Sequence, residues 1–146
     1  MYRTFSESMV IRYYFDTSIW LDFIEERNEP NLPKSDLANE LIHKIVNEAN
    51  IIIYSNAILD ELVKLGYSEQ EVNTMLYELK NYLLFLEFTD KQFGKAKDLS
   101  IKRDVPLLDA LHAFIARDNK CILVTRDAHF KKLLDIIKTH KPEELI

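Results

Sequence analysis

Short apolar runs alternate with amphipathic stretches along almost the whole chain. Most of the runs are four to six residues long, are rich in β-branched, aromatic and aliphatic side chains, and have the length of a strand. The run at 51–54 is entirely apolar or aromatic, which is typical of a strand buried on both faces of a sheet. The pattern predicts strands at residues 10–15, 51–54, 83–88 and 121–125, and a short edge strand at 136–138.

Between these runs, apolar residues recur at helical spacing and helix start signals precede them. Ser68 with Glu71, and Thr89 with Gln92, have the spacing of a capping box. Strands that alternate with helices predict an α/β fold with a parallel sheet covered by helices on both faces. We expect helices at residues 19–24, 35–48, 56–65, 106–117 and 128–134, and two more that begin after Ser68 and after Thr89. The helix at 56–65 should end at Gly66, and Pro106 should be the first residue of the helix at 106–117.

The composition fits one globular domain and excludes several function classes. The chain has 146 residues, of which 47% are hydrophobic and 29% charged. No apolar run is long enough for a membrane helix, and no secretory signal is visible. The single cysteine, Cys121, forms no internal disulfide and favours a reducing, cytoplasmic location. The two glycines are too few for a Gly-rich phosphate loop.

The N-terminal residues fit no predicted element. Met9 is an alternative start, so we interpret residues 1–8 as an extension of unknown role and residues 9–146 as a single domain. The formal charge of −5 also needs an explanation if the partner is a nucleic acid, because such binders are usually basic.

Two acidic residues follow predicted strands directly. Asp16 ends the strand at 10–15, and Asp127 follows the strand at 121–125. Ligands of open parallel sheets bind beyond the carboxyl ends of the strands, so both positions suit a binding site. Both also suit a helix N-cap, and the sequence leaves the two interpretations open.

Asp109 is the most informative acidic residue. From residue 107 to 116, only Asp109 and His112 are not apolar, so the helix is expected to be buried on nearly all sides. A lone carboxylate there costs several kcal/mol unless it is neutralised, paired or bound to a cation. The alternative to a ligand role is a structural pair with His112, one helical turn away.

Helix periodicity does not separate two further candidates, Asp60 and Glu61. Both fall on the polar arc of the helix at 56–65, where a solvated charge is the ordinary interpretation. Asp22 is interpreted as a surface or structural residue.

Basic residues offer one candidate contact surface. Arg126, Lys131, Lys132 and Lys138 would form a modest basic rim, or alternatively a solvated face.

Four segments resemble, in order, the motifs of PIN-domain nucleases. They are F-D-T-S-I-W-L-D-F, S-N-A-I-L-D-E-L, P-L-L-D-A-L-H-A-F-I-A and I-L-V-T-R-D-A-H-F, and they span residues 15–130. The resemblance implies a three-layer α/β/α sandwich with a five-stranded parallel sheet of order 3-2-1-4-5. It also implies that Asp16, Glu61, Asp109 and Asp127 form the catalytic and metal-binding set.

Electrostatics supports a cation at such a site. Two carboxylates ~4 Å apart repel by about 4 kcal/mol at an effective dielectric near 20, so four need protons or a metal. Oxygen ligands favour Mg²⁺ or Mn²⁺ over zinc. We expect Asp16 and Asp127 to bind the metal directly, Asp109 to bind directly or through water, and Glu61 to orient or deprotonate water or complete a second metal site. We expect Thr125 to hydrogen-bond to the cluster.

The resemblance therefore implies a metal-dependent endoribonuclease that hydrolyses RNA phosphodiester bonds. The compact size is similar to the VapC-type toxins of toxin–antitoxin pairs, which implies an antitoxin partner and a homodimer. The helices carrying Trp20 with Phe23, and Leu41 with Ile45, would either pack on the sheet or form a dimer face.

Two alternatives remain open. One is a PIN-like module that binds RNA or protein without catalysis. The other is a small phosphatase, which is disfavoured because Ser18 stands where a second Asp is needed.

Overall fold

The computed structural model describes residues 10–146, so the predicted extension 1–8 and the alternative start at Met9 lie outside the described residues. Five parallel strands form one sheet in the order β3-β2-β1-β4-β5. This confirms the α/β class and the strand order 3-2-1-4-5. The strands are β1 (Arg12–Phe15), β2 (Ile51–Ser55), β3 (Leu83–Leu86), β4 (Ile122–Val124) and β5 (Thr139–His140).

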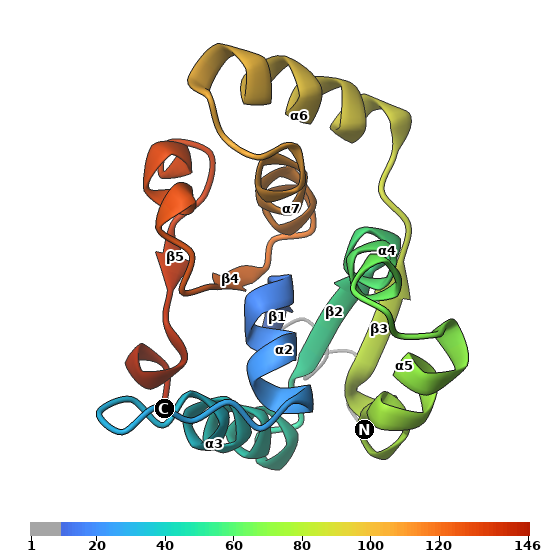
Figure 1. The fold of residues 1–146 in the computed structure, drawn as a ribbon, viewed down its shortest axis with the longest axis vertical. Helices are drawn as coiled ribbons and strands as arrows, with labels where there is room; N and C mark the ends of the chain where they lie inside the picture. Colours follow the sequence, from blue (N-terminus) through green and yellow to red (C-terminus); the bar gives the residue numbers. More distant parts are fainter. Residues whose placement is uncertain (1–9) are drawn as a thin grey trace.

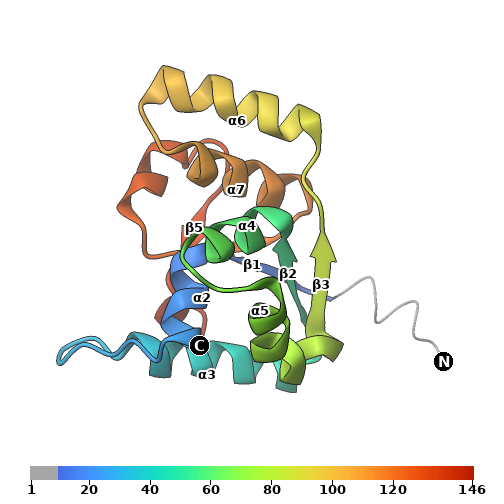
Figure 2. The same ribbon diagram turned by 45° about the vertical axis from the view of Figure 1, so that its right-hand side comes forward.

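Helices cover the sheet on both sides, as Figures 1 and 2 show. α3 lies on one side, and α7 lies on the other with α6 packed outside it. The α-helices are α2 (Thr17–Ile24), α3 (Lys34–Asn47), α4 (Asn56–Lys64), α5 (Glu69–Leu76), α6 (Asp90–Arg103) and α7 (Leu107–Asp118). Three 3₁₀ segments complete the chain: η1 (Tyr77–Tyr82), η2 (Ala128–Leu133) and η3 (Pro142–Glu144).

The local start and stop signals define most helix ends. Both predicted capping boxes form, at the first turns of α5 and α6. After α4, Gly66 has φ of 111°, a left-handed conformation that glycine adopts without the steric cost of a Cβ atom. These signals involve neighbours only three residues apart, which is why the sequence reveals them.

Three local predictions differ from the structure. Pro106 is the N-cap of α7 rather than its first residue, because its ψ of 138° is extended. The predicted helix at 128–134 is a short 3₁₀ turn. The predicted edge strand at 136–138 is wrong, because Ile136 and Ile137 donate backbone hydrogen bonds to Leu133 in a turn and β5 forms three residues later.

The core lies on both faces of the three central strands. Ile52 and Ile53 are fully buried, as expected for a strand covered on both sides. Trp20, Leu41 and Ile45 are also buried in this core and Phe23 is partly buried against it, so these side chains pack within the chain. Within residues 10–146, no helix combines the length and the apolar character needed to cross a bilayer.

Candidate metal centre

Four carboxylates from four elements line one pocket at the carboxyl edge of the sheet. β1 and β4 are hydrogen-bonded neighbours, so Asp16 and Asp127, which follow them, come to the same edge. Glu61 comes from α4 and Asp109 from the first turn of α7. The pocket has a volume of about 200 Å³. The structure thus brings together all four acidic residues that the sequence singles out.

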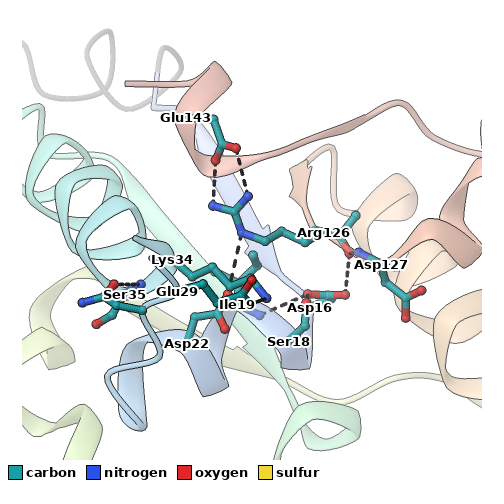
Figure 3. Close-up of polar contacts among 12 residues, drawn as sticks. Asp16, Ser18, Ile19, Asp22, Glu29, Lys34, Ser35, Arg126, Asp127 and Glu143 are labelled. Atoms are coloured by element: carbon teal, nitrogen blue, oxygen red, sulfur yellow. Dashed lines mark hydrogen bonds and ion pairs between the residues drawn. The ribbon is translucent and has the colours of Figure 1, made fainter. Parts of the chain in front are cut away.

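Asp16 is buried and its carboxylate is held by hydrogen bonds (Figure 3). Oδ2 accepts from the Thr125 hydroxyl at 2.5 Å, and Oδ1 accepts from Ser18 at 2.6 Å and from the Ile19 backbone at 3.3 Å. Burial raises the pKa of Asp16, although these hydrogen bonds oppose the shift. Asp16 is therefore an N-cap of α2 and a pocket residue at once, so the two interpretations do not compete.

Asp109 has different surroundings, because its side chain is only 14% exposed and one of its two carboxylate oxygens has no hydrogen-bonding partner among residues 10–146. Its Oδ2 atom accepts no hydrogen bond from residues 10–146, and no Lys or Arg among them forms an ion pair with it. Burial, and then the charges of Asp127, Asp16 and Glu61, raise the pKa of Asp109 to about 8. The alternative pair with His112 is absent, since His112 turns toward other partners.

Glu61 ends a buried hydrogen-bond chain. His112 Nε2 lies 2.5 Å from Glu61 Oε1, and the Thr17 hydroxyl donates to the same oxygen at 2.6 Å. On its other side, His112 Nδ1 lies 2.7 Å from the Tyr14 hydroxyl, which in turn bonds Ser55. Burial alone would raise the pKa of Glu61, but the His112 and Thr17 hydrogen bonds outweigh it and lower the pKa. These contacts distinguish Glu61 from its exposed neighbour Asp60 on the same helix.

Sequence reasoning missed His129. Its Nδ1 atom lies 2.9 Å from Asp127 Oδ1 and 3.4 Å from Asp109 Oδ2. One ligand atom from each of these three residues lies within 4.8 Å of the others, the spacing of a metal site. The signal in the sequence is weak: His129 is two residues after Asp127, and only the start of η2 turns both side chains toward α7.

A second cluster lies beside the pocket and involves Asp22 and Arg126. Asp22 is buried, which agrees with the structural alternative rather than the surface one, and Arg126 is paired with acidic residues rather than free on a basic rim (Figure 3). Arg126 Nε lies 3.8 Å from Asp22 Oδ2, and its two terminal nitrogens donate to Glu143 at 2.9 and 2.7 Å. The strand-end residue Arg126 thereby ties α2 to η3.

The donor set of the pocket fits a divalent cation. Asp109 supplies a buried oxygen that lacks a hydrogen bond from the described residues, and Asp127 and His129 supply donor atoms close to it. Asp16 and Glu61 line the same pocket but lie outside this group of donor atoms within 4.8 Å of one another. Carboxylate oxygens suit Mg²⁺ and Mn²⁺, and an imidazole nitrogen favours the softer ion.

Comparison with known proteins agrees with this architecture. The family model described as "PIN domain" matches residues 13–134. A search of curated proteins found no match.

Three solved structures resemble the fold closely. VapBC2 from Rickettsia felis, bound to a DNA fragment from its promoter, matches with a TM-score of 0.66 and 19% identity over 90% of this chain and 98% of that one. A toxin–antitoxin complex from Klebsiella pneumoniae matches with a TM-score of 0.58 and 19% identity, over 89% of this chain and 97% of that one. FitAcB from Neisseria gonorrhoeae matches with a TM-score of 0.56 and 16% identity, over 91% of this chain and 99% of that one. At these identities the likeness concerns the fold.

Proposed function

The chain belongs to the PIN-domain family, and we propose that it is a Mg²⁺- or Mn²⁺-dependent endoribonuclease that hydrolyses RNA phosphodiester bonds. One observation carries this proposal: Asp109 is a largely buried carboxylate, surrounded by three others, with no cationic Lys or Arg partner in residues 10–146. A buried charge is tolerated only when it is paired, protonated or bound to an ion. A divalent cation from solvent would reduce the repulsion among all four carboxylates at once.

Asp16, Asp109 and Asp127 are the residues that we assign to holding the ion, with His129 as an additional donor. A divalent cation bound there lowers the pKa of a water molecule and stabilises negative charge on the phosphate. Thr125 fixes the Asp16 carboxylate, and its hydroxyl oxygen also accepts from the Asp127 backbone at 3.0 Å. The two strand-end acids are thus positioned through one side chain.

Glu61 is the residue that we assign to orienting the attacking water. Its Oε1 is occupied by Thr17 and His112, which keeps the carboxylate ionised and fixed in direction. Its Oε2 accepts no hydrogen bond from the described residues and is available to water.

We further propose that the chain is the toxin of a toxin–antitoxin pair, with an antitoxin that covers the acidic pocket, and that it forms a homodimer. The support is the likeness in fold to chains crystallised in toxin–antitoxin complexes. Co-expression with the product of the adjoining reading frame tests this partner, and light scattering of the isolated protein tests the dimer. Growth arrest that the neighbouring product relieves is the expected result.

The nuclease activity is tested by incubating transfer, ribosomal and messenger RNA with the protein in Mn²⁺, Mg²⁺ or EDTA. Cleavage in Mn²⁺ or Mg²⁺ that Glu61→Gln removes and Asp60→Asn retains is the expected result. Asp60 is a matched control, because it neighbours Glu61 but is exposed. Absence of cleavage across all RNAs by a folded protein that binds Mn²⁺ would instead support the module without catalysis.

A further inference from the structure

A second pocket opens on the other side of Asp127. It has a volume of about 410 Å³, within the range of pockets that hold small ligands, and Asp127 lines both it and the metal pocket. Its walls come from the segment that follows β4, from η2, from β5 and from residues at the two ends of η3. Three lysines face it, Lys131, Lys138 and Lys141, and we call it the lysine pocket.

The positive charge of this pocket is not neutralised within the described chain. Lys131, Lys138 and Lys141 are exposed, and none forms an ion pair with residues 10–146. By contrast Lys132, the neighbour of Lys131, turns away toward the Asp104 carbonyl. The acidic wall residue Glu144 is engaged locally, because its Oε1 accepts the Lys141 backbone N–H at 2.6 Å.

The lysines stand on elements that are fixed in place. The Thr125 backbone donates to the His140 carbonyl at 2.9 Å, which anchors β5 beside β4. The two hydrogen bonds from Arg126 to Glu143 hold η3 against the strand end (Figure 3). The charge of Arg126 is therefore paired with Glu143, and the positive charge of the pocket that is unpaired within residues 10–146 comes from the three lysines. Groups mounted on anchored elements bind with a smaller entropic cost than groups on free loops.

We propose that the lysine pocket binds one nucleotide of single-stranded RNA, with Lys131, Lys138 and Lys141 around its backbone phosphate. This inference rests on the proposed ribonuclease function and identifies where the strand lies next to the metal pocket. A phosphate in the lysine pocket is adjacent, across Asp127, to the phosphate at the metal ligands. Lysines attract the phosphate without reading the base, so this contact sets affinity and register rather than sequence preference.

The proposal also explains how a chain with a charge of −5 engages RNA. The excess acid includes the four carboxylates of the metal pocket, whose charge a cation offsets. The local field on the other side of Asp127 is basic, because three lysines without ion pairs to described residues gather there. Net charge is then a poor guide to binding, since the relevant charges act within about one Debye length of the strand.

The test compares two triple variants with the same net charge. One is Lys131→Ala/Lys138→Ala/Lys141→Ala, and the control is Lys91→Ala/Lys97→Ala/Lys102→Ala on the exposed side of α6. Binding of a labelled single-stranded RNA is measured by fluorescence anisotropy in EDTA, where metal-dependent cleavage is absent. We expect the pocket variant to lose at least tenfold in affinity and the control less than twofold. The slope of log affinity against log salt should fall by about 0.7, because the proposal places one phosphate among the three lysines and each phosphate contact contributes about 0.7 for single strands.

Three results would overturn the proposal: equal losses in both variants, no loss in the pocket variant, or a polyglutamate peptide that binds as tightly and with the same lysine dependence. The last result would make the pocket a site for acidic polypeptide. If the triple variant does not fold, the three single variants carry the same test, since each removes one exposed side chain.

The outcome is independent of the nuclease test. Lysine-dependent RNA binding without any metal-dependent cleavage supports the lysine pocket and contradicts the proposed function. Cleavage with an unchanged KM in the pocket variant contradicts the lysine pocket and leaves the nuclease intact.

Discussion

Two carboxylates with little exposed surface, Asp22 and Asp109, lie near the same edge of the sheet and are surrounded by opposite charges. The Asp22 side chain is 5% exposed and the Asp109 side chain 14%. Burial raises the pKa of both. Around Asp22 the charges of Lys34, Arg126 and Arg27 oppose this shift. Around Asp109 the charges with the largest effect are those of Asp127, Asp16 and Glu61, and each of them adds to the shift.

The difference separates a structural acid from a ligand. The charge of an acid that lies among basic side chains is offset within the fold, as that of Asp22 is by Lys34, Arg126 and Arg27. An acid that the chain surrounds with like charge is satisfied only by a proton or an external ion. Sequence position alone does not distinguish the two, since both lie on helices that start at the same sheet edge.

The largest expected contrast is in catalysis. Asp109→Asn should lower metal-dependent RNA cleavage by more than about 100-fold, because it removes a metal ligand, while Asp22→Asn should retain most of the activity. Initial rates in saturating Mn²⁺ measure both variants. Similar losses for the two would remove the functional distinction between the clusters.

The second contrast is the sign of the stability change without metal. Asp22→Asn should destabilise the fold by about 1–3 kcal/mol, because it leaves the buried Arg126 with one fewer partner. Asp109→Asn should instead raise the melting temperature in EDTA at pH 8 by about 2–4 °C or more, because it removes a repelled charge. Thermal melts of the two variants and the wild type in EDTA show whether each substitution raises or lowers the melting temperature. Destabilisation by Asp109→Asn at that pH would mean that its charge has a partner.

The third contrast is in the pH dependence. The pKa of Asp109 rises from 3.8 to about 8 on folding. The folded state therefore binds more protons than the unfolded state between these values, and its stability falls as pH rises from about 4 to 8. Asp109→Asn should flatten this part of the curve, and Asp22→Asn should flatten it less. Unfolding free energies measured across this range in EDTA check the prediction, and parallel curves for wild type and Asp109→Asn would refute it.

The smallest expected effect sharpens the description of the metal. His129→Asn should weaken Mn²⁺ binding about three- to tenfold and Mg²⁺ binding less, because imidazole suits the softer ion. His43→Asn on the exposed side of α3 is the matched control. Calorimetric titration of both variants and the wild type with Mn²⁺ and with Mg²⁺ measures the change in affinity for each ion. An equal loss for both ions would exclude His129 as a ligand that sets preference.

The parts of the fold that the sequence predicts are those with local causes. The capping boxes, the Gly66 helix end and the apolar strand β2 depend on neighbours in sequence or on composition. The strand order came from the resemblance of four motifs, because periodicity does not define which strands pair. The error at 136–138 has a tertiary cause: β5 pairs with β4 through residues three positions later.

In the site, too, the residues that could be predicted are those with local causes. Asp109 could be singled out because a carboxylate on an otherwise apolar helix is anomalous within a short window. The roles of Asp22, Arg126 and His112 could not, because their partners are distant in sequence; Tyr14 and His112 are 98 residues apart. His129 was missed because a single exposed histidine carries no signal until α7 brings Asp109 beside it.

The central claim, that Asp109 and Asp127 converge to hold a divalent ion, is tested most directly by anomalous diffraction from crystals grown with Mn²⁺. We expect a peak at about 2.0–2.3 Å from carboxylate oxygens of Asp109 and Asp127. No peak in that pocket at saturating Mn²⁺, or a peak elsewhere on the chain, would contradict the account.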